Sequence, residues 1–400
     1  MPILYYFFLL FALFFINSLV NIVLLWHLVL GNPHTTAVGM VFCLSAILPY
    51  LLQKRSASFT KWMTTFPYKG LCLAELCIGI VLANAALGLE VFTSWWLYGV
   101  TVVFNVVYAI ILHLIETTTA TKVLQKKIEG HHAARFMQFA GQAGMILGAI
   151  LAGFLLEYVS LKHIMLIGAL TAGLVVIVVF PYRKTKLTQE EDDFMQSKAF
   201  GKVQTSLQKR LCILLFLLAL SLQVQSFNFL FPILLSHERK WGPMVLGTVD
   251  ACSGLGSILG LFFSITLKKY VWYFCLITIG FFDAIVSLSS TFFPIAGGAF
   301  LVAFCFTLVR VEYQNRLYAS YADAQEAAVW SGHLAYNTVL LQGLAPLVLG
   351  YMVEKGITAT HLFLGLGGFL PLLTMSLHSL CSPNPKVKQP ISTSSKIEPI

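Results

Sequence analysis

Residues 3–30 read ILYYFFLLFALFFINSLVNIVLLWHLVL and contain no Asp, Glu, Lys or Arg. The hydrocarbon core of a bilayer is about 30 Å thick, and a helix needs roughly 20 apolar residues to cross it. A secretory signal peptide would carry a basic segment before a shorter apolar run and a small-residue cleavage site after it. The run has neither feature, so we expect residues 3–30 to form the first membrane-spanning helix.

The rest of the chain repeats this pattern. Only 11% of the 400 residues are charged and 58% are hydrophobic, whereas soluble domains carry about 25% charged residues. So little charge cannot cover a water-facing surface, which excludes a soluble enzyme with one anchor. We therefore predict an all-α polytopic membrane protein of about twelve helices in two pseudo-symmetric six-helix bundles. The predicted spans are 3–30, 36–52, 70–89, 95–115, 136–157, 163–181, 211–235, 244–267, 271–290, 294–315, 327–353 and 358–380.

The positive charges predict the orientation. With a cytoplasmic N-terminus, every Lys and Arg falls on the cytoplasmic side except Lys162, Arg239, Lys240 and Lys355, as the positive-inside rule requires. The net charge of +9 then indicates membrane orientation and not a nucleic-acid partner. We expect a multi-pass protein of a bacterial inner (plasma) membrane, with both termini cytoplasmic.

The polar segments divide the chain. We predict an N-terminal bundle (1–181), a solvated cytoplasmic linker (182–210), a C-terminal bundle (211–381) and a disordered cytoplasmic tail (382–400). A weak internal repeat supports two related halves, because GFLLE at 153–157 and GYMVE at 350–354 end corresponding spans. Such matches are expected when an axis along the membrane normal relates the halves.

Six spans, a charged linker and six more spans resemble the major facilitator superfamily over nearly the whole chain. GQAGMILG at 141–148 is similar to the glycine-rich fifth helix of family exporters. LGTVD at 246–250 is similar to the eighth helix of the enterobactin-exporter-like branch. Small residues at such spacings also let helices pack closely. The loop QKRSAS at 53–58 lacks the Gly and Asp that the family carries between spans two and three.

Acidic residues inside spans are the candidates for proton coupling, because a charge at a helix centre costs about 2.5–3.5 kcal/mol in insertion experiments. Asp250 is expected two turns inside the eighth span, and Asp283 two turns from the outer end of the ninth. Glu75 lies more than one turn inside the third span. Each could instead be an acid that reaches water or pairs with a neighbouring donor.

Neutral polar residues form stripes on three spans. Asn17 and Asn21 are four residues apart on one helix face, and Gln225 and Asn228 are three apart on another. The family resemblance implies that spans one, four, seven and ten line a central cavity. Hydrogen bonding between helices is the alternative role for the same side chains. Our candidate substrate-binding residues are Asn17, Asn21, Asn105, Gln225, Asn228 and Glu312.

The tenth span also carries two arginines. Glu312 and Arg316 are four residues apart and can pair on one face. Arg310 is only two residues from Glu312 and points elsewhere. We expect Arg310 to extend to the cytoplasmic surface. If it faces the cavity instead, an anionic substrate becomes plausible.

Catalytic, metal and nucleotide motifs are missing from the sequence. The eight cysteines form no CxxC pair and lie in or beside apolar segments, which is typical of packing residues. Without a P-loop, transport energy should come from an ion gradient. We therefore expect no enzyme activity, no metal site and no cofactor, and a monomer whose partners are the bilayer, protons and a small molecule.

The leading functional hypothesis is proton-coupled export of a small amphipathic metabolite, siderophore or drug. An importer of a nutrient or iron chelate with the same fold is the first alternative. A membrane sensor or scaffold that has lost transport is the second. The altered loop at 53–58 favours the sensor, and the retained polar stripes argue against it.

Overall fold

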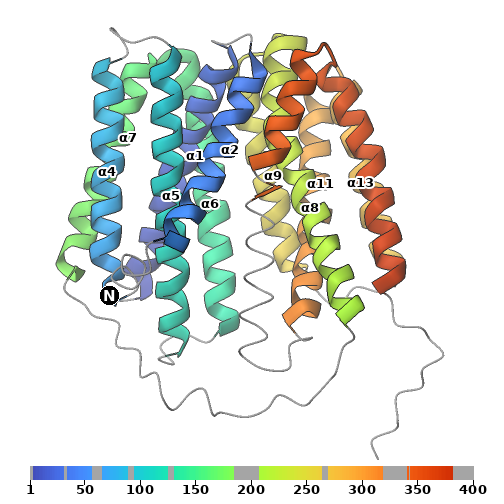
Figure 1. Cartoon of the computed structure of the whole chain (residues 1–400), viewed down its shortest axis with the longest axis horizontal. Coiled ribbons are helices and arrows are strands. Elements are labelled where there is room, and N and C mark those ends of the chain that lie inside the picture. Colours follow the sequence, from blue (N-terminus) through green and yellow to red (C-terminus); the bar gives the residue numbers. More distant parts are fainter. Residues whose placement is uncertain are drawn as a thin grey trace, which may run out of the picture.

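A computed structural model describes residues 3–30, 34–55, 65–88, 94–124, 130–183, 207–263, 269–318, 340–341 and 343–381, and these residues form helices and short connections (Figure 1). The first-half helices are α1 (Ile3–Leu30), α2 (Thr35–Arg55), α4 (Pro67–Gly88), α5 (Ser94–Leu124), α6 (Gly130–Tyr158), α7 (Leu161–Val179) and the 3-10 turn η1 (Phe180–Tyr182). The second-half helices are α8 (Leu207–Ile233), the π-helical η2 (Leu234–Arg239), α9 (Pro243–Phe262), α10 (Lys269–Leu288), α11 (Phe292–Tyr318), the helix Gly343–Glu354 and α13 (Ala359–Cys381).

The predicted spans and the observed helices agree in number and order. Ten of the described helices are long and apolar enough to cross a membrane, and Thr35–Pro49 and Gly343–Glu354 are shorter apolar helices. These twelve correspond to the twelve predicted segments, which confirms an all-helical polytopic membrane protein. The connection expected at 116–135 is largely helical instead, because α5 continues to Leu124 and α6 begins at Gly130. Hydropathy detects only the apolar part of a helix, and these extensions are polar.

Several predicted segments lie outside the described residues. These are most of the linker (184–206), the tail (382–400), most of the loop after the second span (56–64) and the first part of the eleventh span (327–339).

The connections define two sides of the molecule. The ends of α7 and η1, the start of α8 and the start of α1 lie at one side, which we call the linker side (Figure 1). Helices α1 and α8 end at the opposite side, which we call the far side.

Large apolar side chains point outward from the bundle. Leu215 of α8 is 50% exposed and Phe274 of α10 is 67% exposed. Water would disfavour such a surface, whereas lipid tails solvate it without cost. The outward-facing phenylalanines and leucines therefore form the lipid-contacting surface that the composition predicted.

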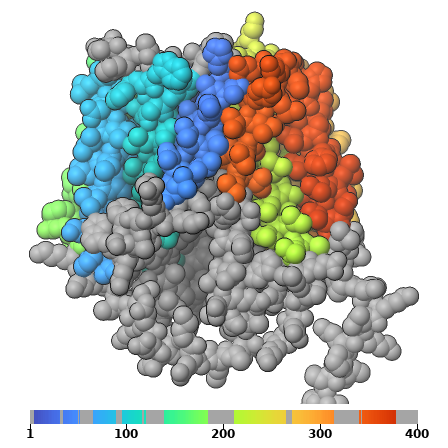
Figure 2. All heavy atoms as spheres, viewed as in Figure 1, coloured from blue at the N-terminus to red at the C-terminus, as the bar shows by residue number. Residues whose placement is uncertain are grey.

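The two halves are in direct contact along two helix pairs. Helix α6 packs on α9, and α2 packs on the helix Gly343–Glu354; Figure 2 shows the second contact as the border between the blue and orange surfaces. At Gly247 of α9, a methyl group would collide with the carbonyl oxygen of Ala149 of α6. Glycine is required there because the two backbones touch, as expected for small residues between membrane helices.

The internal repeat marks equivalent positions in the two contacts. Gly153, near the end of α6, meets Pro243 at the start of α9, and a Cβ at Gly153 would lie 3.0 Å from the Pro243 carbonyl oxygen. Gly350, near the end of its helix, meets Thr35 at the start of α2, and a Cβ there would lie 2.5 Å from the Thr35 carbonyl oxygen. Both glycines therefore lie where one half touches the other at the far side.

Polar contacts reinforce the far-side closure. Thr35 Oγ1 donates to the Gly350 carbonyl oxygen at 2.7 Å. His34 Nδ1 lies 3.2 Å from Glu354 Oε1. Each pair joins residues more than 300 positions apart, so the far side is held by contacts between the first and last quarters of the chain.

Substitution of Gly247 by Ala should destabilise the protein by about 1–3 kcal/mol, because overpacking forces the backbones of α6 and α9 apart. The measurement is thermal unfolding of purified protein in detergent. Gly297→Ala is the matched control, because its added methyl on α11 meets nothing within 4 Å. Equal melting temperatures for the two variants would contradict the close contact.

Candidate functional site

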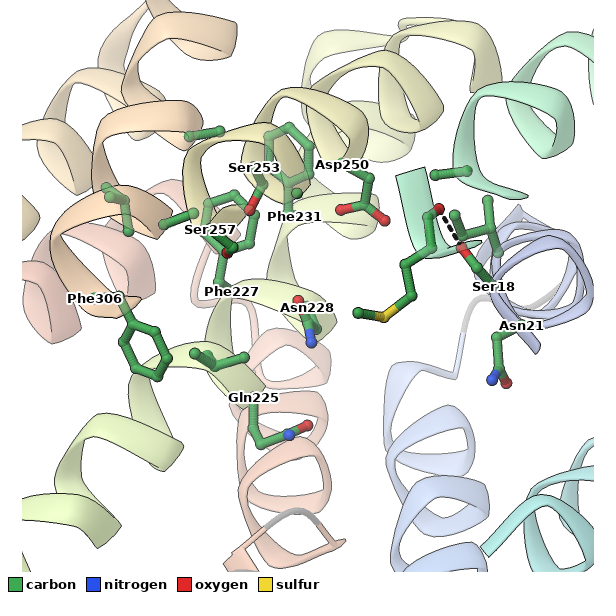
Figure 3. Close-up of a pocket in the computed structure, with 18 of the residues that line it drawn as sticks. Ser18, Asn21, Gln225, Phe227, Asn228, Phe231, Asp250, Ser253, Ser257 and Phe306 are labelled. Carbon is green, nitrogen blue, oxygen red and sulfur yellow. Dashed lines mark hydrogen bonds between the residues drawn. The ribbon is translucent and has the colours of Figure 1, made fainter. Parts of the chain in front are cut away.

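A cavity of about 490 Å³ lies between the two halves. Side chains of α1, α5 and α6 form one wall, and side chains of α8, α9 and α11 form the other. Figure 3 shows part of this space, with Ser18 and Asn21 of α1 facing Gln225 and Asn228 of α8. Every span that the family resemblance assigns to the cavity contributes to it, and α6 and α9 contribute as well.

Five of the six predicted substrate-binding residues line this cavity. They are Asn17, Asn21, Asn105, Gln225 and Asn228. The stripes bring them together because residues three or four apart on a helix share one face. Amide groups donate and accept hydrogen bonds without carrying charge, so they supply polarity at the lowest cost in a membrane.

Hydrogen bonds orient the first-half amides. Asn21 Nδ2 donates to Asn17 Oδ1 at 2.6 Å, and Asn105 Nδ2 donates to the Thr101 carbonyl oxygen at 3.0 Å. Ser18 Oγ donates to the Met145 carbonyl oxygen at 2.9 Å and ties α1 to α6 (Figure 3). The two amide contacts lie within single helices, and the Ser18 contact joins α1 to α6.

Asp250 is the acidic side chain in the cavity lining. It lies seven residues, or about two turns, into α9 from the far side. Ser253 and Ser257 follow at i+3 and i+7 and line the same space (Figure 3). Helix α9 therefore presents one continuous polar face to the cavity, and the carboxyl group of Asp250 lies at the end of this face that is nearer the far side.

Arg310 is part of the cavity lining and its side chain is exposed, so both expectations for it, extension to the surface and contact with the cavity, stay predictions. It lies eighteen residues into α11 from the far side. At 1.5 Å per residue, its depth differs from that of Asp250 by roughly 16 Å. Asp250 and Arg310 therefore lie at different levels of the same cavity.

Glu312 does not join the other five predicted binding residues. It is half-buried on α11 but is not part of the cavity lining. Two residues correspond to about 200° of helix rotation, so Glu312 faces away from the cavity when Arg310 faces into it. The side chain of Arg316, its expected partner, lies outside the described residues.

The other two acidic candidates are buried outside the cavity lining. Glu75 of α4 is 2% exposed, and its Oε2 has no hydrogen-bond partner. Asp283 of α10 is fully buried and accepts a hydrogen bond from Nε2 of Gln223. Gln223 itself lines the cavity, so Asp283 lies one side chain behind the wall.

Sequence reasoning did not select two further amides in the lining, Gln142 of α6 and Gln223 of α8. Both are uncharged polar residues within apolar helices, the signal that identified the other five. Gln142 lies in the glycine-rich segment 141–148, which resembles the fifth helix of family exporters. Phe42, Phe227, Phe229, Phe231 and Phe306 supply aromatic surface.

Metal binding has no support in the described part of the chain, where no group of three or more His, Cys, Asp or Glu side chains could hold an ion. The lining itself offers hydrogen bonding, aromatic contact, a carboxyl group at Asp250 and a positive charge at Arg310.

The comparisons with known proteins agree with this architecture. The Major Facilitator Superfamily profile matches residues 133–322. A comparison with curated proteins gives no match. The nucleoside transporter NupG is similar in structure, with TM-score 0.65 and 16% identity over 95% of this chain and 99% of that one. The POT family transporter PepTSo is also similar in structure, with TM-score 0.66 and 10% identity over 94% of this chain and 97% of that one. A bacterial homolog of the human lysosomal transporter Spinster has TM-score 0.61 and 12% identity over 94% of this chain and 92% of that one.

The fold is that of a polytopic helical membrane protein with a cavity between its two halves. The Major Facilitator Superfamily profile spans just under half of the chain, and the solved transporters are similar in fold to nearly all of it. At these identities the structural likeness is one of fold, and the resemblance to the enterobactin-exporter-like branch stays a prediction.

Cysteine labelling tests the cavity without knowledge of its substrate. In a background that lacks the eight native cysteines, Asn228→Cys should react with a hydrophilic maleimide in native membranes, because the thiol would face water. Leu215→Cys on the same helix should react at least about tenfold more slowly, because its side chain faces lipid, where no water supports the thiolate. Equal labelling at both positions would contradict the assignment of α8 faces.

Proposed function

We propose that the chain is a proton-coupled exporter of a small amphipathic molecule in the plasma membrane. The observation that carries the proposal is the cavity between the halves, which combines amides, phenylalanines and one carboxyl group at Asp250. The linker side would be cytoplasmic, as the distribution of Lys and Arg indicates.

The lining favours a substrate with hydrogen-bonding groups on an apolar or aromatic body. Seven amide side chains can pair with hydroxyls, carbonyls or ring nitrogens, while Phe227, Phe231 and Phe306 offer apolar contact. A cavity of about 490 Å³ is within the range of sites that hold drug-sized ligands. A small metabolite, siderophore or drug therefore suits the site, and nucleosides are a useful first panel because the similar NupG is a nucleoside transporter.

Asp250 is the candidate for coupling substrate movement to protons. Its carboxyl group faces the same cavity as the amides, so a proton and a substrate would compete for one space. A carboxylate in a membrane interior is costly, and protonation removes that cost. An exporter would therefore exchange an incoming proton for the outgoing molecule.

Alternating access would use the far-side contacts as a gate. Two halves that rock about a midplane site expose it to each side in turn. The contacts at Gly153 and Gly350 hold the far side together and would have to separate when the substrate leaves. The contacts at Thr35 and Glu354 would separate with them.

Import of a nutrient is the main alternative, because the same cycle runs in either direction. A sensor or scaffold is the second alternative. The amide lining argues against a scaffold, since polar groups without a ligand in a membrane cavity give little in return for their cost. The direction of flux distinguishes the first two, and any flux excludes the third.

Asp250→Asn should abolish coupling in everted vesicles that hold a pH gradient. Wild-type protein should dissipate the gradient when a transported compound from a nucleoside and amphipathic-drug panel is added. The variant should give the background rate of vesicles without the protein, because Asn cannot exchange a proton. The Asp250→Asn variant should still exchange labelled compound inside the vesicles for unlabelled compound outside. This result would show that the variant is folded and has lost only the coupling to protons.

Glu157→Gln is the matched control, because Glu157 is an exposed carboxyl group at the far-side end of α6. It should retain the wild-type rate. Gradient dissipation by Asp250→Asn at the wild-type rate would remove Asp250 from the mechanism.

A further inference from the structure

Gln223 and Asp283 form a polar pair directly behind the cavity wall. Gln223 is 5% exposed on α8 and lines the cavity, while Asp283 is fully buried on α10. Nε2 of Gln223 donates to Oδ2 of Asp283. Gly367 of α13 also packs closely on Asp283, because a Cβ added at Gly367 would lie 2.9 Å from the Asp283 Cβ. Gln223 is thus the polar side chain that separates Asp283 from the cavity.

One oxygen atom of each group lacks a hydrogen-bond partner. These atoms are Oε1 of Gln223 and Oδ1 of Asp283, and both are buried. While Asp283 is ionised, both atoms are acceptors, so neither can satisfy the other. A buried carboxylate with a single donor is unfavourable, and an unsatisfied buried acceptor costs about 1–3 kcal/mol. A single proton on Oδ1 would supply the missing donor to both groups.

We propose that Asp283 carries this proton and that Gln223 is its positioning residue. The O–H at Oδ1 donates to Oε1 of Gln223, and the Gln223 amide N–H donates to Oδ2. The two groups then form a closed pair with two hydrogen bonds and no net charge. Gln223 holds the proton in place from the cavity side.

The pair connects protonation to cavity occupancy, and this step rests on the proposed proton-coupled transport. Release of the proton requires Gln223 to turn toward the cavity and admit water to Oδ1. A substrate that binds the Gln223 amide favours this turn, whereas an empty cavity favours the closed pair. Gln223 thereby gives a buried carboxyl group access to the same cavity that Asp250 faces.

Several charged and titratable groups lie on the elements around this pair. Among the described residues these are Arg310, Glu312, Tyr313 and Cys305 on α11, Tyr273 and Cys275 on α10, Cys212 on α8, His361 on α13, and His237, Glu238 and Arg239 on η2. The contact between this set and the Asp283 region is indirect: Arg239 Nη2 donates to the carbonyl oxygen of Ser287, one turn along α10. Gln223 therefore supplies the hydrogen bond that Asp283 receives from a neighbouring helix.

Infrared difference spectroscopy of the full-length protein, titrated with acid and base, tests the pair without a substrate. Wild-type protein should show the carbonyl stretch of a protonated carboxyl group at neutral pH that Asp283→Asn removes. Gln223→Leu should shift this band, because the carboxyl group loses both hydrogen bonds. Ser226→Ala is the matched control, since Ser226 is a buried residue of α8 that bonds only its own helix, at Leu222.

If Asp283→Asn does not fold, aspartate labelled with ¹³C at its carboxyl group keeps the test available. The label shifts the carbonyl-stretch bands of aspartic acids and leaves the band of Glu75 unshifted. In labelled protein, Asp250→Asn removes any band of Asp250, so that a band of Asp283 can be told apart from it. Absence of an Asp283 band at neutral pH would overturn the protonated pair. A band that Gln223→Leu leaves unshifted would overturn the role of Gln223. Either result can occur whether or not Asp250→Asn loses coupling, so the two proposals fail separately.

Discussion

Backbone contact between the two halves is the constraint on which the rest of the structure depends. At Gly247 and Gly350 the partner backbone occupies the space that a side chain would need. This contact brings α6 onto α9 and the helix Gly343–Glu354 onto α2 at the far side. The cavity lies between the two halves, where residues of α1 and α5 line it from one side and residues of α8 and α11 from the other. Small residues thus determine both the closed end of the molecule and the location of its site.

The distribution of polar groups follows from the cost of placing them in lipid. Uncharged amides form most of the polar lining, while the charges in it are Asp250 and Arg310 at different depths. Asp283 lies behind this lining with Gln223 as its partner. The lining therefore carries charge at two separate positions, and at one of them, Asp250, a proton can change it. An amide-lined cavity with separate carboxyl groups would suit the proposed coupling between a substrate and protons.

Much of the fold and part of the site could be predicted from local sequence. Apolar length defines a span, and spacing of three or four residues brought Asn17 with Asn21 and Gln225 with Asn228 into the cavity. The orientation of α11 could not be predicted, because its rotation depends on packing against α9 and α10, which are distant in the chain. Glu312 consequently lies outside the cavity lining, whereas Arg310 is part of it. The partner of Asp283 lies sixty residues away on α8, and no local pattern reveals such a contact.

The central claim is that the chain moves a small molecule outward through this cavity. Untargeted mass spectrometry of cells and medium tests it most directly, with a deletion strain complemented by the wild-type chain, by Asp250→Asn or by no protein. The account predicts a compound that accumulates in the medium with the wild-type chain and remains in the cells with the other two. A compound that stays in the medium of the deletion strain and enters cells with the wild-type chain would contradict export. If the distribution of every compound is the same with and without the chain, transport itself would be contradicted.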